Sequence, residues 1–179
     1  MSAPALSPVE NKPPSGVEYP SMELVRFSSK WEEGVKLFFR DLKEGGDEVF
    51  FSPHPSDDNS INQIANYHGK DLYYLLVEEE KVLGYGMLRG WDEGYPIPSL
   101  GVAIHSSARG AGLGKIFMQF LHVLAFRRDA SKVRLRVHIN NDKAIGLYKS
   151  LGYVFEENTN QADYLVGFKS LGREWRNEI

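Results

Sequence analysis

The sequence predicts a mixed α/β fold, with one central sheet and helices on both of its faces. Strand patterns and helical patterns alternate along the chain, in the order β-α-α-β-β-β-α-β-α-β-β. An apolar strand also runs through a glycine-rich loop directly into a helix near the middle of the chain. The chain has 179 residues, 42% of them hydrophobic and 25% charged, which suits one globular domain with a substantial core.

The first half of the chain is expected to hold a strand, two helices and a hairpin. Ser29 and Glu32 have the spacing of a capping box at the start of the first helix. Pro53 and Pro55 predict an irregular loop after it, because proline interrupts regular structure. The expected elements are a strand at 22–27, a helix at 30–44, the loop at 50–60, a helix at 61–68 and hairpin strands at 71–78 and 82–91.

The second half of the chain carries the clearest periodicities. Apolar residues recur every three or four positions after the glycine-rich loop, which predicts a core helix, and strict alternation predicts the strand that follows it. The expected elements are a loop at 91–98, a strand at 99–105, helices at 113–126 and 141–151, a strand at 133–139, and strands at 153–157 and 164–168 around a polar turn at 158–161.

Composition limits the domain organisation and the partners. Residues 1–20 contain five prolines and little periodicity, so we expect a disordered N-terminal tail before a single domain at residues 21–179. A net charge of −3 favours neither nucleic acid nor membrane as a partner. The absence of a spanning apolar run and of a signal-peptide pattern predicts a cytoplasmic protein. The chain has no cysteine, which excludes disulfides and an acyl-cysteine intermediate, and no motif predicts a metal.

The glycine-rich loop has the features of an anion site. Gly110, Gly112 and Gly114 free the backbone for unusual dihedral angles and for close approach of a ligand. The amides of the loop lie at the start of a helix, where unpaired N–H groups and the helix dipole favour a phosphate or pyrophosphate. Arg109 adds a planar cationic group suited to phosphate.

The residues of this loop do not match two familiar phosphate-binding motifs, but they match a third pattern. A dinucleotide-binding fingerprint requires glycine where Lys115 or Phe117 stands, and a Walker loop requires glycine in place of Arg109. What remains is R-x-x-G-x-G at 109–114, followed by N-x-x-A-I-x-L-Y-x-x-L-G-Y at 141–153. These two motifs together resemble the GNAT superfamily of acyl-CoA-dependent N-acetyltransferases.

The resemblance implies a central, mixed but mostly antiparallel twisted sheet of about seven strands, and acetyl-CoA as the co-substrate without a metal. It implies that the strand before the loop pairs its backbone with the pantetheine arm. It also implies that the loop binds the pyrophosphate and that an asparagine on the last helix helps to hold the pantetheine. The positions carried over are Ala103, Ile104, His105, Arg109, Gly110, Ala111, Gly112, Leu113, Gly114 and Asn141.

The catalytic acid implied by the resemblance is Tyr148, whose hydroxyl would lie near the CoA sulfur. Asn141, Ala144, Ile145 and Tyr148 share one face of the predicted last helix, because they follow the i, i+3, i+4, i+7 spacing. Tyr148 would then bind the co-substrate and protonate, or donate a hydrogen bond to, the leaving thiolate. The alternative interpretation is that Tyr148 is a core aromatic residue between Ala144 and Leu151.

The general base is not identified by the sequence. Many members of the superfamily have glutamate at the position of Ser99, and serine cannot accept a proton in the same way. The candidates are His54, Asp92, Glu93, His105 and His138. Asp92 and Glu93 are also candidates for holding a cationic amine, or they form a solvated turn.

The leading functional hypothesis is an acetyl-CoA-dependent N-acetyltransferase with a small-molecule amine acceptor, such as an amino sugar or an amino acid derivative. One alternative is a protein acetyltransferase that modifies an N-terminus or a lysine. Another is a non-catalytic acyl-CoA-binding regulatory module, which the serine at position 99 favours. A homodimer is compatible with the sequence, which does not determine the oligomeric state.

Overall fold

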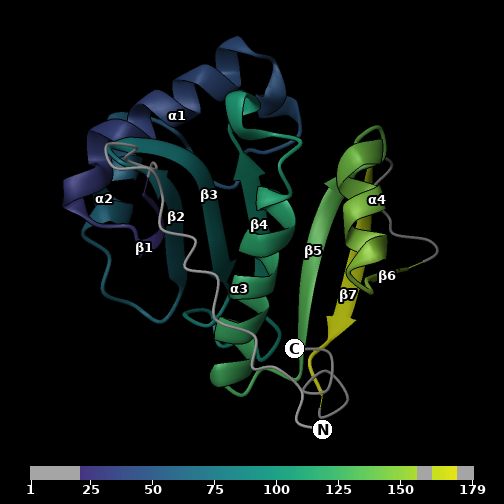
Figure 1. Ribbon diagram of the computed structural model, residues 1–179. Coiled ribbons are helices and arrows are strands. Elements are labelled where there is room, and N and C mark those ends of the chain that lie inside the picture. The colour runs from purple at the N-terminus through teal and green to yellow at the C-terminus, as the bar shows by residue number, and fades with distance from the viewer. Residues whose placement is uncertain (1–20, 157–162, 173–179) are drawn as a thin grey trace, which may run out of the picture.

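The computed structural model describes residues 21–156 and 163–172 of the chain. The expected N-terminal tail and the expected turn at 158–161 lie outside the described residues. Within the described part, seven strands form one sheet in the order β1-β2-β3-β4-β5-β7-β6 (Figure 1). Neighbouring strands are antiparallel except for β4 and β5, which are parallel. The prediction of a mixed, mostly antiparallel sheet with helices on both faces is therefore confirmed.

The elements alternate along the chain nearly as expected. The helices are α1 (Glu32–Glu44), α2 (Asp58–Ala65), α3 (Leu113–Arg127) and α4 (Asp142–Ser150). The strands are β1 (Met22–Arg26), β2 (Leu72–Glu78), β3 (Lys81–Arg89), β4 (Ser99–Ile104), β5 (Lys132–His138), β6 (Val154–Phe155) and β7 (Tyr164–Ser170).

Two of the expected helix starts are wrong, and local backbone geometry explains both. The capping box does not form, because residues Ser29–Trp31 make a 3₁₀ turn and α1 begins after it without a side-chain cap. Helix α2 begins at Asp58, inside the segment predicted as a loop. The carboxylate of Asp57 accepts the Ser60 amide there, so Asp57 is an N-cap that starts a helix two residues after Pro55.

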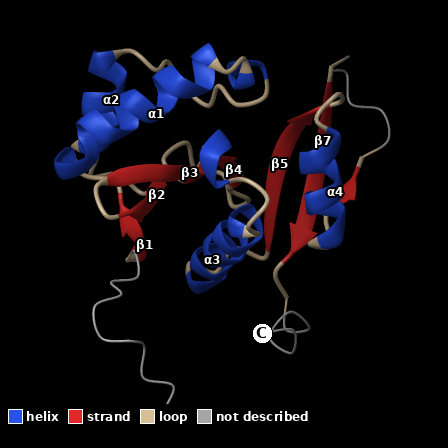
Figure 2. Cartoon of the chain, turned by 45° about the horizontal axis from the view of Figure 1, so that its top comes forward, coloured by secondary structure: helices blue, strands red, loops and turns tan. Residues whose placement is uncertain are grey.

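Helices cover both faces of the sheet (Figure 2), and each face carries one hydrophobic core. Helices α1 and α2 pack on one face over residues such as Leu75 and Tyr85, and α3 and α4 pack on the other over residues such as Leu135. Gly86 permits the second contact, because a Cβ atom there would lie 2.6 Å from the Phe117 ring of α3. The strand residues therefore alternate between the α1/α2 face and the α3/α4 face, which fixes the face on which each strand side chain of the site lies.

His122 is buried in the core of the α3/α4 face. Its Nε2 forms a 2.8 Å hydrogen bond with the Tyr153 hydroxyl, and its exposed fraction is 1%. Burial, with Lys169 nearby, lowers the pKa of His122 to about 4. The folded protein therefore holds this imidazole in its neutral form at neutral pH.

This burial predicts acid sensitivity. Between pH about 6.5 and about 4 the unfolded chain protonates His122 and the folded chain does not, so the free energy of unfolding should fall as pH decreases, by up to about 3 kcal/mol. Chemical denaturation at several pH values should show a shallower fall in the His122→Leu variant than in the native chain. Equal pH slopes in the two proteins would contradict the assignment.

Candidate functional site

The site begins where β4 and β5 diverge. These strands pair at one position, Ser99 with Arg134, and then separate toward the carboxyl end of β4 (Figure 1). The space beside the separated strands belongs to a cavity of about 1290 Å³. Residues of β4, β5, α4 and the glycine-rich loop line it, together with the segments at 47–53 and 89–97. The cavity therefore joins the two predicted motifs.

The glycine-rich loop presents free amides to this cavity. Gly110 and Gly112 have φ angles of 86° and 79°, and no atom lies within 4 Å of a Cβ built on either residue. Within the described chain, the amides of residues 110–114 donate to no backbone carbonyl, and no side chain caps the start of α3. This open row of donors at a helix N-terminus fits a pyrophosphate. Gly110 and Gly112 have the unusual dihedral angles that the sequence predicted, whereas Gly114 lies inside α3 and has no positive φ. The binding role of Gly110, Ala111, Gly112, Leu113 and Gly114 stays a prediction.

Arg109 differs from the free phosphate-binding group that the sequence suggested. Its guanidinium forms a two-pronged ion pair with Asp47, at 3.2 and 2.7 Å, and its Nε donates to the Ile104 carbonyl at 2.9 Å. The side chain is 43% exposed, so the pair is screened by solvent. Arg109 therefore ties the glycine-rich loop to the segment after α1, and a bound phosphate would have to share it with Asp47.

Along β4, the backbone N–H and C=O groups of successive residues point alternately to β3 and to the opening, which the sequence did not reveal. The His105 amide donates to the Leu83 carbonyl of β3 at 2.8 Å, and Ala103 is paired with Tyr85 of β3. Because backbone groups alternate in direction along an antiparallel strand, Ala103 and His105 direct theirs to β3. The backbone groups of Val102 and Ile104 point to the opening instead. Of the three residues expected to pair with pantetheine, only Ile104 has backbone groups that point to the opening, and Ala103 and His105 do not. Val102, which was not expected, also has backbone groups that point there.

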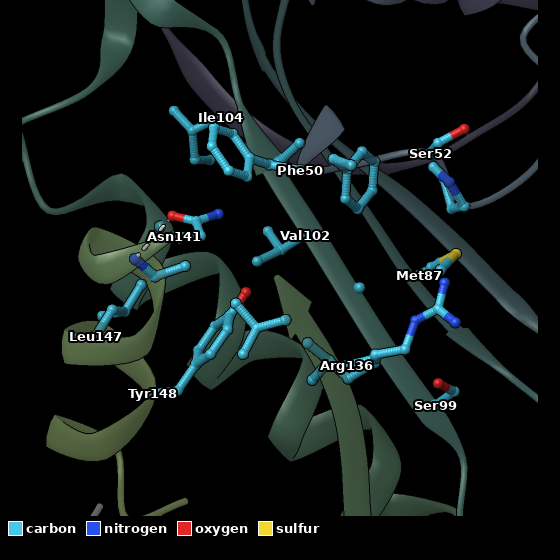
Figure 3. Close-up of a pocket in the computed structure, with 18 of the residues that line it drawn as sticks. Phe50, Ser52, Met87, Ser99, Val102, Ile104, Arg136, Asn141, Leu147 and Tyr148 are labelled. Carbon is cyan, nitrogen blue, oxygen red and sulfur yellow. Dashed lines mark hydrogen bonds between the residues drawn. The ribbon is translucent and has the colours of Figure 1, made fainter. Parts of the chain in front are cut away.

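Helix α4 brings Asn141 and Tyr148 to the same cavity (Figure 3). The Oδ1 atom of Asn141 accepts the Ala144 amide and caps the helix, which leaves its Nδ2 group as a donor. The Tyr148 hydroxyl points into the cavity, although the residue is 8% exposed and its ring packs against Tyr153. Burial raises the pKa of Tyr148 to about 12, so it stays protonated at neutral pH. Tyr148 is both a core aromatic residue and a proton donor at the cavity.

Four of the five candidates for the general base do not line the cavity. The His54 ring contacts the Tyr85 hydroxyl at 2.8 Å, and His105 lies between Asp41 at 3.1 Å and Ser107 at 2.7 Å. The Asp92 carboxylate accepts hydrogen bonds from the backbone N–H groups of Lys70 and Asp71, and it does not line the cavity. The His138 ring packs between Phe50 and Tyr164. Among the described residues that line the cavity, Glu93 is the one candidate present.

Sequence reasoning singled out Ser99 but missed most of the other residues at the other end of the cavity. Met87, Arg89 and Ser99 line that end together with Arg134 and Arg136, and Tyr95 of the segment at 89–97 also lines the cavity. The signal that could have revealed the two β5 residues was the alternation at 133–139, which predicted Arg134 and Arg136 on one strand face. The contributions from 47–53 and 89–97 depend on loop conformations that no periodicity encodes.

Comparison with known proteins identifies the family. The model of the acetyltransferase (GNAT) family matches residues 36–153, which is more than half of the chain and includes both motifs. The chain belongs to the GNAT acetyltransferase family. It is therefore an acetyltransferase enzyme of a family that uses acetyl-CoA, and the regulatory alternative is set aside. No curated protein matches the sequence.

Solved structures share the fold of this GNAT enzyme at low identity. It is similar to a GCN5-related N-acetyltransferase from Kribbella flavida, with 17% identity and a TM-score of 0.69 over 83% of this chain and 97% of that chain. It is also similar to the paia N-acetyltransferase from Thermoplasma acidophilum in complex with coenzyme A, with 13% identity and a TM-score of 0.69 over 84% and 99%. A ribosomal-protein-S5-alanine acetyltransferase from Vibrio fischeri gives 14% identity and a TM-score of 0.68 over 88% and 97%.

No group of three or more His, Asp or Glu side chains among the described residues is placed to hold a metal ion. No helix in that part of the chain is long and apolar enough to cross a membrane.

The geometry of the loop predicts the effect of one substitution. Gly112→Val should weaken CoA binding about tenfold or more, because valine at a φ of 79° is strained by about 1–2 kcal/mol and its branched side chain fills the space before the amides. Titration calorimetry with CoA measures this directly. Gly94→Val is the matched control, since Gly94 has a φ of 84° and the same open space outside the glycine-rich loop. Equal CoA affinity in both variants would exclude the loop as the phosphate site.

Proposed function

We propose that this enzyme transfers the acetyl group of acetyl-CoA directly to the primary amine of a small molecule, such as an amino sugar or an amino acid derivative. The observation that supports this most is the arrangement of one cavity with two chemically different ends. One end combines the open β4 edge, the glycine-rich loop and Tyr148, and the other is lined by aromatic and charged side chains. A thioester held at the first end would meet an amine held at the second.

In this proposal each part of the first end has a separate task. The amides of residues 110–114 bind the pyrophosphate, and the backbone of Val102 and Ile104 pairs with the amide groups of the pantetheine arm in the manner of an added strand. Asn141 donates from Nδ2 to the same arm. Together they fix the thioester carbonyl beside the acceptor amine, which lowers the entropic part of the barrier.

Proton movement follows from the reaction itself. The amine nitrogen bonds to the acetyl carbon, the carbon–sulfur bond breaks, and one proton leaves the nitrogen while one is gained by the sulfur. With its pKa near 12, Tyr148 is a weaker acid than a thiol with a reference pKa of about 8.5. It therefore serves best as a hydrogen-bond donor that stabilises the developing thiolate. The amine proton leaves through water in the open cavity or through Glu93 at its rim.

A protein acceptor is the second candidate. Two structural neighbours carry names that specify such acceptors, the ribosomal-protein-S5-alanine acetyltransferase from Vibrio fischeri and a ribosomal-protein-S18-alanine N-acetyltransferase from Escherichia coli. The acceptor end of this cavity is open to solvent past the exposed Glu93 and Tyr95, so a peptide N-terminus could reach it. A peptide acceptor would appear as acetylated product by mass spectrometry.

Release of the CoA thiol tests the proposal. A colorimetric thiol reagent should report turnover with amino sugars or amino acid derivatives and less with polyamines or short peptides. The protein adds no background, because it has no cysteine. Turnover confined to peptides would replace the small-molecule proposal with the protein alternative. Absence of turnover with every amine, while acetyl-CoA binds by calorimetry, would contradict both acceptor classes tested.

Removing one hydroxyl tests the role of Tyr148. Tyr148→Phe should lower kcat about 10²- to 10⁴-fold and leave the affinity for acetyl-CoA nearly unchanged, because the donor acts on the leaving sulfur. Tyr74→Phe is the matched control, since Tyr74 packs against Phe120 and is not part of the cavity lining. An unchanged kcat in Tyr148→Phe would show that the hydroxyl has no catalytic role.

A further inference from the structure

Three strands place two arginines on either side of a serine at the end of the cavity remote from α4. Arg89 at the end of β3 is paired with Ser99 of β4, and Ser99 is paired with Arg134 of β5. Directly paired residues of neighbouring strands have their side chains on the same face of the sheet, with Cβ atoms about 5 Å apart. The two arginine side chains therefore leave the sheet on either side of the small Ser99 side chain.

The face on which this row lies is fixed by the core. The neighbouring residues Leu88, Leu100 and Val133 are all buried in the cluster under α3. Because side chains alternate along each strand, Arg89, Ser99 and Arg134 point to the opposite face, and all three line the cavity. On β5 the next residue of the same face is Arg136, and Figure 3 shows its side chain on the side of Met87 and Ser99, away from Asn141 and Leu147.

The protein supplies few negative charges to neutralise the two arginines, Arg89 and Arg134. Arg89 Nη1 donates to the Pro53 carbonyl at 2.9 Å, and its Nε lies 3.9 Å from the Asp71 carboxylate, buried and without an acceptor among the described residues. Asp71 already accepts the amides of Gly90 and Trp91 at 2.9 Å. Arg134 forms no ion pair with any described residue. Ser99 between them adds no charge. Three carboxylates line the cavity: Asp47, which is paired with Arg109, and the exposed Glu48 and Glu93.

We propose that Arg89 and Arg134, on either side of Ser99, form a subsite for an anionic group of the acceptor, a carboxylate or a phosphate carried by the same molecule as the amine. Guanidinium groups bind these oxyanions through paired, charge-assisted hydrogen bonds. The Ser99 hydroxyl, on a short side chain between the two arginines, adds one more hydrogen-bond donor. Arg136, which stacks on Tyr164 at 4.3 Å, extends the cationic wall along β5. The inference rests on the proposed function and specifies its acceptor as an amine that carries a negative charge.

The subsite has a binding test that needs no turnover. Calorimetric titration of CoA-saturated protein with inorganic phosphate and with succinate should show saturable binding, because bound CoA already fills the phosphate site at the glycine-rich loop. Arg134→Gln and Ser99→Glu should each weaken this binding about tenfold or more, the second by placing a carboxylate between the arginines. Arg26→Gln is the matched control, since Arg26 is an exposed strand arginine outside the cavity lining. No saturable binding, or equal binding in all variants, would overturn the subsite.

Turnover gives the second test and separates the two proposals. Thiol release is measured with matched pairs of acceptors, one anionic and one neutral. An amino acid is compared with its amide, and an amino sugar phosphate is compared with the amino sugar. The two pairs together show whether the subsite prefers a carboxylate or a phosphate. The anionic member should have a KM about 10- to 100-fold lower, and Arg134→Gln should remove this difference while Arg134→Lys keeps part of it. The KM for acetyl-CoA should not change. A preference for the neutral members would overturn the anion subsite and leave the proposed function intact. Anion binding without turnover of any amine would refute the function alone.

Discussion

The separation of β4 from β5 is the constraint on which the rest of the site depends. A parallel pair that continued along both strands would satisfy the backbone groups of Val102 and Ile104 and close the sheet. Because pairing stops after Ser99 and Arg134, the backbone groups of Val102 and the Ile104 N–H stay available beside a cavity of about 1290 Å³, whereas the Ile104 carbonyl accepts from Arg109 Nε. The fold thus leaves a strand position open within its own sheet, which an extended, amide-bearing ligand such as pantetheine fits by its chemistry.

The elements around this opening are fixed by contacts across the chain. Helix α3 lies close to β3 because Gly84 and Gly86 leave room for Phe117, and this contact sets the position of the helix N-terminus with its free amides. The Arg109–Asp47 pair joins the glycine-rich loop to the segment after α1. Next to that segment, His54 contacts Tyr85, and Arg89 holds the Pro53 carbonyl. The glycine-rich loop and the segment at 47–53 are therefore positioned by one connected set of interactions.

The two ends of the cavity differ in how they obtain their chemistry. The end at α3 and α4 presents backbone amides, a helix N-terminus and one buried phenol. The end at Met87 and Ser99 relies on side chains from three strands and two loops, with arginines on two of the strands. This division is consistent with a family that keeps one co-substrate and accepts different amines.

The sequence by itself determined the order of elements, the positive φ angles at Gly110 and Gly112, and the presence of Asn141 and Tyr148 on one helix face. Those features depend on local spacing and on the conformational freedom of glycine, which a pattern of residues encodes directly. The tertiary structure alone decided that Arg109 is held by Asp47 from 62 positions earlier, that His54 and His105 are engaged in the core, and that Ile104 rather than Ala103 faces the opening. It also decided that Arg89, Ser99 and Arg134 form one row, because strand register brings together residues that no sequence spacing relates.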